Sequence, residues 1–195
     1  MLYYNAKFAT GIALLLAILI PVYWFSQFGV FFEKLLWAST ESTSYSSYIF
    51  TVFMHVLMIV TVLNVRASLA HIDSRWLKRI TLAFAIVIAL FSAAWVLFGS
   101  IEDPGAYSSL IIVSTIVQLL FFSGFVAFCA LLQFHQPKLP ASLRMASLFM
   151  VLSILLPAIT LAMLLPVTPI MLTISCGFIA VYFYKSTQPQ PVDLM

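Results

Sequence analysis

The sequence predicts an all-α integral membrane protein with six transmembrane helices. Three observations support this fold class. The chain is 64% hydrophobic and only 8% charged, and its mean hydropathy is +1.12. Soluble domains carry about 25% charged residues, so lipid must surround most of these side chains. The apolar residues fall into six stretches, and the basic residues collect at the ends of those stretches on one side.

The first predicted span covers residues 8–26. Alanines recur at every fourth position, at Ala9, Ala13 and Ala17. This small-xxx-small spacing allows helices to approach closely in lipid. A proline and bulky aromatic residues follow where a signal peptide would carry a small-residue cleavage site. We therefore interpret the stretch as a retained span and not as a cleaved signal.

A short helix lying in the membrane interface is predicted directly after the first span. The segment FGVFFEKLLWAS has apolar residues at i, i+3, i+4, i+7 and i+8, which gives one apolar face. The alternative is a simple continuation of the first span. The polar segment TESTSYSSY then forms an outer loop. The apolar face consists of Phe28, Phe31, Phe32, Leu35 and Leu36.

The second and third spans are expected at about 48–69 and 80–98. They are joined by the charged segment AHIDSRWLKR. The third span repeats the four-residue alanine spacing at Ala85, Ala89 and Ala93, which predicts a second packing face.

The fourth, fifth and sixth spans are expected at about 108–134, 144–165 and 169–185. The last apolar stretch is too long for one crossing, and the sequence LLPVTP within it predicts a tight hairpin. Residues 1–185 therefore form a single transmembrane domain. Residues 186–195 are polar and contain prolines, which predicts a disordered cytoplasmic tail.

The distribution of basic residues predicts the orientation. With the N-terminus inside, eight of the nine Lys and Arg residues lie on the inner side, and Lys34 alone lies outside. This asymmetry predicts a multi-pass protein of the inner (cell) membrane with N- and C-termini cytoplasmic. The same asymmetry explains the net positive charge of the chain, so nucleic-acid binding is not needed to account for it. The inner residues are Lys7, Arg66, Arg75, Lys78, Arg79, Lys138, Arg144 and Lys185.

Charged residues are missing from the depth of every predicted span, which argues against ion-coupled pumps. The sequence contains no Gly-x-Ser-x-Gly, His-Glu-x-x-His or P-loop motif. Cys129 and Cys176 lie in apolar stretches and form no Cys-x-x-Cys pair, so we expect neither a disulfide nor a metal site. The chain is thus predicted to be non-enzymatic.

Two polar stripes are the candidate binding residues. Each follows helical spacing along one arc of its span. Interhelical hydrogen bonds would explain both stripes, and the sharper alternative is a hydrated cavity between spans 2 and 4 that opens to the cytoplasm. The stripe of span 2 continues into the loop and consists of Thr61, Asn64, Ser68, His71 and Arg75. The stripe of span 4 consists of Ser114, Thr115, Gln118, Cys129 and Gln133.

The three histidines differ in what they could do. His55 lies in the outer half of span 2, where a hydrogen bond across a helix interface is a simpler interpretation than a metal ligand or proton relay. His71 and His135 are expected at a common depth near the cytoplasmic side. They are the only histidine pair that could bracket a haem.

The sequence therefore predicts a subunit or accessory of a larger membrane assembly, or a protein that binds a small neutral or lipidic ligand between spans 2 and 4. The expected partners are membrane lipids and other membrane subunits or further copies of the chain, with no nucleic acid and no cofactor. One alternative is a redox subunit that binds haem b or quinone through His71 and His135. The other is a small-solute channel or carrier.

Overall fold

The computed structural model describes the backbone of residues 5–37, 45–69, 75–99, 107–134, 139–159 and 167–187. Side chains are described in these ranges except at 27–37, 45–48, 95, 97–99, 107–115, 117–119, 122 and 157–159. Of the predicted tail, residues 188–195 lie outside the described part.

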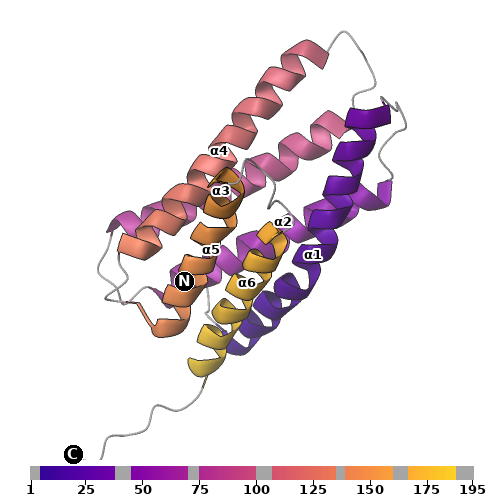
Figure 1. Cartoon of the computed structure of the whole chain (residues 1–195). Helices are drawn as coiled ribbons and strands as arrows, with labels where there is room; N and C mark the ends of the chain where they lie inside the picture. The colour runs from indigo at the N-terminus through magenta and orange to yellow at the C-terminus, as the bar shows by residue number, and fades with distance from the viewer. Residues whose placement is uncertain are drawn as a thin grey trace, which may run out of the picture.

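The described residues form six helices and no strand (Figure 1). Each of the predicted spans 2 to 6 falls on one helix. The first and last residues of these helices lie within about six residues of the expected positions. The helices are α1 (Ala6–Trp37), α2 (Tyr45–Ser68), α3 (Arg75–Gly99), α4 (Tyr107–Phe134), α5 (Ala141–Ile159) and α6 (Val167–Lys185).

Four of these helices are long and apolar enough to cross a membrane. The qualifying stretches are Ala6–Ser26, Ile49–Ser68, Arg75–Ala94 and Val167–Lys185. In α4 and α5 the described apolar stretches are shorter, at Ser123–Phe134 and Ala141–Leu156. The chain is therefore an all-helical, membrane-embedded protein.

Helix α1 begins at a capping residue. The Asn5 side-chain oxygen accepts hydrogen bonds from the backbone N–H groups of Lys7 and Phe8, at 3.1 and 3.2 Å. These N–H groups have no partner within the helix, and an Asn at this position stabilises a helix start by satisfying them.

A side-chain hydrogen bond joins α2 to α3. Arg66 Nε, near the end of α2, donates to the Lys78 carbonyl in the first turn of α3 at 3.1 Å.

The separate interfacial helix predicted after the first span is wrong. Helix α1 continues without a break to Trp37 and includes that segment. No proline follows Pro21 within α1, so nothing in the backbone chemistry ends the helix there. The segment has helical apolar periodicity, but the same periodicity is found at the end of one long helix.

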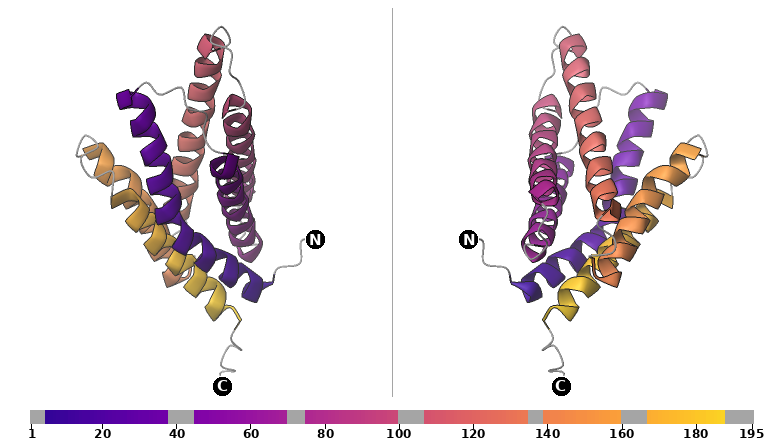
Figure 2. Two further views of the ribbon diagram at one scale, coloured as in Figure 1. Left: turned by 90° about the vertical axis from the view of Figure 1, so that its right-hand side faces the viewer. Right: turned by 90° about the vertical axis from the view of Figure 1, so that its left-hand side faces the viewer.

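Pro21 lies at the middle of α1, and Figure 2 shows the helix bending along its length, as an internal proline predicts.

The six helices pack as a closed ring in chain order. Helix α6 packs along both α1 and α5, and α3 packs along both α2 and α4. Contacts of α1 with α2 and of α4 with α5 join these two three-helix groups. Figure 2 shows the groups converging toward the end that carries both termini and diverging toward the opposite end.

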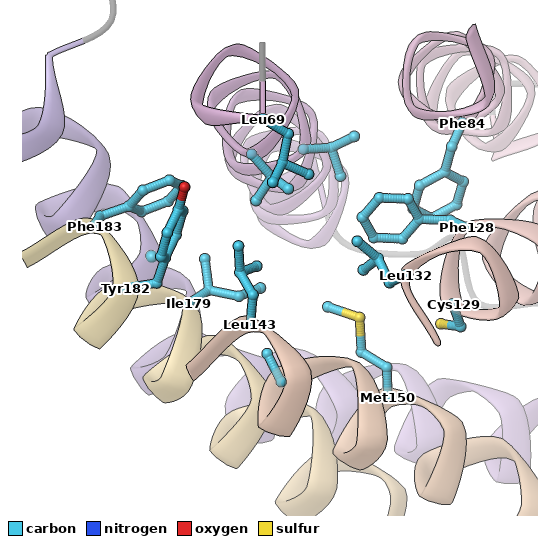
Figure 3. Close-up of a cluster of buried hydrophobic side chains, with 14 of the residues drawn as sticks. Leu69, Phe84, Phe128, Cys129, Leu132, Leu143, Met150, Ile179, Tyr182 and Phe183 are labelled. Atoms are coloured by element: carbon cyan, nitrogen blue, oxygen red, sulfur yellow. The ribbon is translucent and has the colours of Figure 1, made fainter. Parts of the chain in front are cut away.

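The main apolar core lies at the converging end. Figure 3 shows Phe84 and Phe128 side by side, and Leu69, Leu132 and Leu143 pointing into the space between the helices. A second cluster lies where α1, α2 and α6 meet. We call it the three-helix cluster, and its buried members are Leu16, Ala17, Ile20, Met54, Leu57 and Cys176.

The predicted small-residue faces are confirmed in part. Ala9, Ala13 and Ala17 of α1 are all buried, and so is Ala85 of α3. Ala89 and Ala93, however, are exposed. Ile88 is the last buried residue among the described side chains of α3, and Figure 2 shows the helices diverging toward that end.

Candidate ligand-binding site

A hydrogen bond between Tyr23 and His55 joins α1 to α2. The Tyr23 hydroxyl lies 3.3 Å from Nε2 of His55, and the His55 side chain is only 2% exposed. This contact confirms the expected role of His55 as a histidine hydrogen-bonded across a helix interface. The other ring nitrogen, Nδ1, is buried and has no hydrogen-bond partner among the residues that the structure describes.

Aromatic rings surround the His55 imidazole on both sides. Tyr23 meets it edge-on with ring centres 5.9 Å apart, and Phe91 of α3 does the same at 5.3 Å. Phe91 in turn stacks on Phe121 of α4 at 4.8 Å, and Phe50 packs against Tyr23 at 6.2 Å. A row of rings therefore runs from α1 through α2 and α3 to α4, and Tyr23 and His55 are its polar members.

The hydrogen bond to Tyr23 indicates which nitrogen of His55 carries the proton. If Tyr23 donates to Nε2, the proton is on Nδ1 and one buried donor remains unpaired. In the other tautomer the Nδ1 lone pair is unpaired, and so is the phenol proton. Since unpaired buried groups are costly, the first arrangement is favoured. Nδ1–H is then a donor without an acceptor.

The Thr173 hydroxyl of α6 is a second buried group that has no hydrogen-bond partner within the described part of the chain. Threonines in helices usually donate to the carbonyl four residues earlier. Thr10, Thr61 and Thr81 do so here, at 2.7, 2.8 and 2.6 Å. The Thr173 hydroxyl does not follow this pattern, so its donor is left for another acceptor.

His55 and Thr173 each lie close in sequence to members of the three-helix cluster. His55 follows Met54, a buried member of that cluster, and Thr173 lies one turn before Cys176, another member. Tyr23 and Leu172 pack against the same cluster. Two buried donors without a described acceptor are therefore present, one on α2 and one on α6.

The described residues of the predicted span 2 stripe bond to their own helix. Thr61 donates to the Leu57 carbonyl, Asn64 Nδ2 to the Val60 carbonyl at 2.8 Å, and Ser68 to the Val65 carbonyl at 2.7 Å. Thr61 is buried, whereas Asn64 and Ser68 are half-buried. Arg75 is exposed at the start of α3, and His71 lies outside the described residues.

In the predicted span 4 stripe, Gln133 faces α5. Its Nε2 donates to the Ser147 hydroxyl at 2.8 Å, and that hydroxyl donates to the Arg144 carbonyl at 2.9 Å. Cys129 is buried in the main core. The side chains of Ser114, Thr115 and Gln118 lie outside the described part, as does His135. A shared cavity between spans 2 and 4, and a haem site at His71 and His135, therefore stay predictions.

Helices α5 and α6 are also joined by hydroxyl groups. The Ser175 hydroxyl donates to the Ala146 carbonyl at 2.8 Å, and the Thr168 hydroxyl donates to the Ser153 carbonyl at 3.2 Å. Both hydroxyls are buried, and each gives a helix-to-helix bond of the kind that membrane proteins use in place of a hydrophobic driving force. These bonds fix α6 and therefore fix the position of Thr173.

Cys129 and Cys176 are both buried free thiols. Across the residues that the structure describes, no group of three or more His, Cys, Asp and Glu side chains could hold a metal ion.

Sequence reasoning found His55 but missed Tyr23 and Thr173. Thr173 belongs to neither of the two predicted polar stripes, and no spacing rule relates Tyr23 to a histidine 32 residues later. Comparison with known protein families, curated proteins and solved structures found no match to this chain.

Proposed function

We propose that this chain is a non-enzymatic, six-span protein of the inner membrane that binds a small neutral or lipidic ligand inside its helix bundle. The observation that carries the proposal is the chemistry of the buried polar residues. Among the described side chains they are Thr51, His55, Thr61, Thr81, Ser147, Ser153, Thr168 and Ser175, so every one is threonine, serine or histidine.

An interior of this kind suits an uncharged ligand. A phosphate or carboxylate would need Arg or Lys to compensate its charge, and a cation would need carboxylates. Hydroxyl and imidazole groups instead form hydrogen bonds with neutral oxygen and nitrogen atoms at little electrostatic cost. A ligand that partitions into lipid can also reach such a site without crossing water.

The orientation belongs to the same proposal. Eight of nine basic residues on one side support an orientation with both termini in the cytoplasm. In this orientation the converging end of the bundle, which holds the main core, would face the cytoplasm (Figure 2). The three-helix cluster lies further outward along α1, α2 and α6. The chain would act alone or as a subunit of a larger assembly.

The test is to identify what the full-length protein retains. After purification in a mild detergent, native mass spectrometry should detect a bound neutral organic molecule or lipid, and solvent extraction should release it. A protein that carries nothing beyond detergent would contradict the proposal. A visible absorption spectrum with a Soret band that is lost in His71→Ala would replace it with the haem alternative.

The two-group architecture favours one second candidate, a small-solute carrier. Hydrogen bonds between side chains cross both junctions of the groups, Tyr23 with His55 at one and Gln133 with Ser147 at the other. Two bundles that rock against each other are a common arrangement in carriers. Solute flux into proteoliposomes that falls in Asn64→Leu and Gln118→Leu would favour this function over simple binding.

A further inference from the structure

We propose that a group of basic side chains where α2 meets α3 binds the phosphate of an anionic phospholipid from the surrounding membrane. The lipid lies along the outer face of α3, so this site is separate from the interior of the bundle. The inference goes beyond the proposed function and does not depend on it. We call the group the α2–α3 basic cluster, and it consists of Arg66, Arg75, Lys78 and Arg79.

The first observation is the position of Arg66. It is half-buried in the last turn of α2, and its Nε donates to the Lys78 carbonyl in the first turn of α3 at 3.1 Å. This bond holds the guanidinium against α3, and the two helices pack along each other. A guanidinium has five N–H donors, and among the described contacts only the Nε donor has an acceptor. The two Nη groups are therefore available for the bidentate phosphate contact that arginine favours.

The second observation is the surplus of positive charge around Arg66. Residues 66–79 contain four basic residues and one acidic residue, Asp73, which lies outside the described part of the chain. Even a salt bridge from Asp73 would leave three of these four positive charges without compensation. A surplus of this kind at a membrane surface attracts anionic headgroups. It also disfavours phosphatidylcholine, because the choline group carries a positive charge of its own.

The third observation is the apolar surface that continues from the basic cluster along α3. Four exposed residues follow at spacings of four, three and four positions, which place them on one face of the helix. They are Arg75, Arg79, Leu82 and Ile86. This face presents guanidinium groups at the end of the helix and apolar side chains further along, in the same order as the phosphate and acyl chains of a phospholipid.

Trp76 indicates the depth of this end of α3. Its side chain is 68% exposed and lies in the same turn as Arg75 and Lys78. Tryptophan is enriched where the membrane meets water, because its ring is apolar and its N–H is polar. The first turn of α3 is therefore expected at the level of the lipid headgroups, where the phosphate of a phospholipid lies.

The experiment measures lipid binding to the full-length chain in detergent by native mass spectrometry. Phosphatidylglycerol and phosphatidylcholine with identical acyl chains are titrated separately, and the dissociation constant of the first bound lipid is determined. The wild type is compared with Arg66→Gln and with the double variant Arg75→Gln/Arg79→Gln. The matched control is Arg144→Gln/Lys185→Gln, which removes two exposed positive charges from α5 and α6.

We expect the wild type to bind phosphatidylglycerol about tenfold more tightly than phosphatidylcholine. A basic residue near a membrane surface strengthens the binding of anionic lipid about fivefold, so Arg66→Gln should weaken phosphatidylglycerol binding by that factor and Arg75→Gln/Arg79→Gln by about 25-fold. The control should stay within twofold of the wild type. Phosphatidylcholine should bind all variants equally.

Three results would overturn the inference. Equal affinity of the wild type for the two lipids would show that the cluster does not select anionic lipid. A control that loses as much binding as Arg75→Gln/Arg79→Gln would show that general surface charge explains the preference. Displacement of phosphatidylglycerol by an equal concentration of inorganic phosphate would show a site for the free ion and not for a lipid.

One variant also affects the packing of the helices. Arg66→Gln removes the hydrogen bond that joins α2 to α3. If this variant does not yield monodisperse protein, Arg75→Gln/Arg79→Gln decides the outcome, because both of its side chains are exposed.

Discussion

The Tyr23 hydroxyl lies 3.3 Å from Nε2 of His55 and joins two helices that belong to different three-helix groups. Gln133 and Ser147 make the corresponding link, at 2.8 Å, where α4 meets α5. The described hydrogen bonds between helices of one group run from a side chain to a backbone carbonyl, whereas these two junctions each carry one between two side chains. Because lipid supplies no hydrophobic drive for helices to associate, directional bonds at the junctions determine how the groups fit together.

Removing only the Tyr23 hydroxyl should destabilise the protein more than removing both partners. Tyr23→Phe leaves both nitrogens of the buried His55 ring unpaired, so we expect a loss of about 1–2 kcal/mol. The double variant Tyr23→Phe/His55→Phe removes both polar partners and keeps their ring shapes, so its stability should lie within about 1 kcal/mol of the wild type or above it.

The measurement for this pair is reversible unfolding in mixed detergent and SDS micelles. Tyr184→Phe is the control, because Tyr184 is 56% exposed on α6 and should leave stability unchanged. A double variant that loses the sum of the two single losses would show that the two side chains do not interact.

The junction of α4 and α5 gives a separate prediction. Ser147→Ala removes the acceptor of the Gln133 amide and should destabilise the protein by about 0.6–2 kcal/mol. Ser26→Ala is the matched control, because Ser26 is exposed and bonds only to the Tyr23 carbonyl of its own helix among the described contacts. The two variants are compared by the same SDS unfolding assay, and equal stabilities would contradict a role for this bond.

The predicted orientation can be tested by accessibility labelling in intact cells. Cys129 and Cys176 are first replaced by alanine, so that only the introduced cysteine can react. Both native thiols are buried, and alanine is a small apolar replacement for each. Single cysteines are then introduced at Ser44 and Ser142. A membrane-impermeant maleimide should label position 44 in intact cells and position 142 only after permeabilisation. The reverse pattern would show that the positive-inside prediction fails for this chain.

The sequence was sufficient to locate helices α2 to α6, because each combines a long apolar run with a proline, glycine or charged segment at its end. It failed at the end of α1, where apolar periodicity alone cannot distinguish a new helix from a continuing one. It placed Ala9 and Ala13 correctly on a buried face but not Ala93, because burial there depends on how far the helices diverge.

The candidate site was harder to predict than the fold. Periodicity identified Asn64 as part of a polar stripe, yet its amide bonds to Val60 of its own helix, just as Thr10 bonds to Ala6. Spacing along one helix cannot show whether a side chain donates to a carbonyl of its own helix or to a group on a neighbouring helix. The pairing of Tyr23 with His55 depends on which helices are neighbours, and that information is absent from any single apolar stretch.

The contact between α3 and α4 gives the final prediction, which concerns a glycine. A Cβ placed on Gly124 would lie 3.2 Å from Cδ2 of Phe84. Phe84 cannot yield easily, because its ring is held among Phe121, Phe125 and Phe128 with centres 6.0, 5.9 and 5.4 Å away. Gly124→Ala should therefore lower stability by about 1–3 kcal/mol, the usual cost of overpacking a core.

Gly11 and Gly177 are matched controls for this substitution, because a Cβ at either position would meet nothing within 4 Å. Alanine there should be neutral or raise stability by up to about 1 kcal/mol, since alanine favours a helix more than glycine does. Unfolding in SDS micelles measures all three variants. If Gly124→Ala were as stable as Gly177→Ala, the ring of Phe84 would have room to move, and the tight approach of α3 to α4 would not be needed for stability.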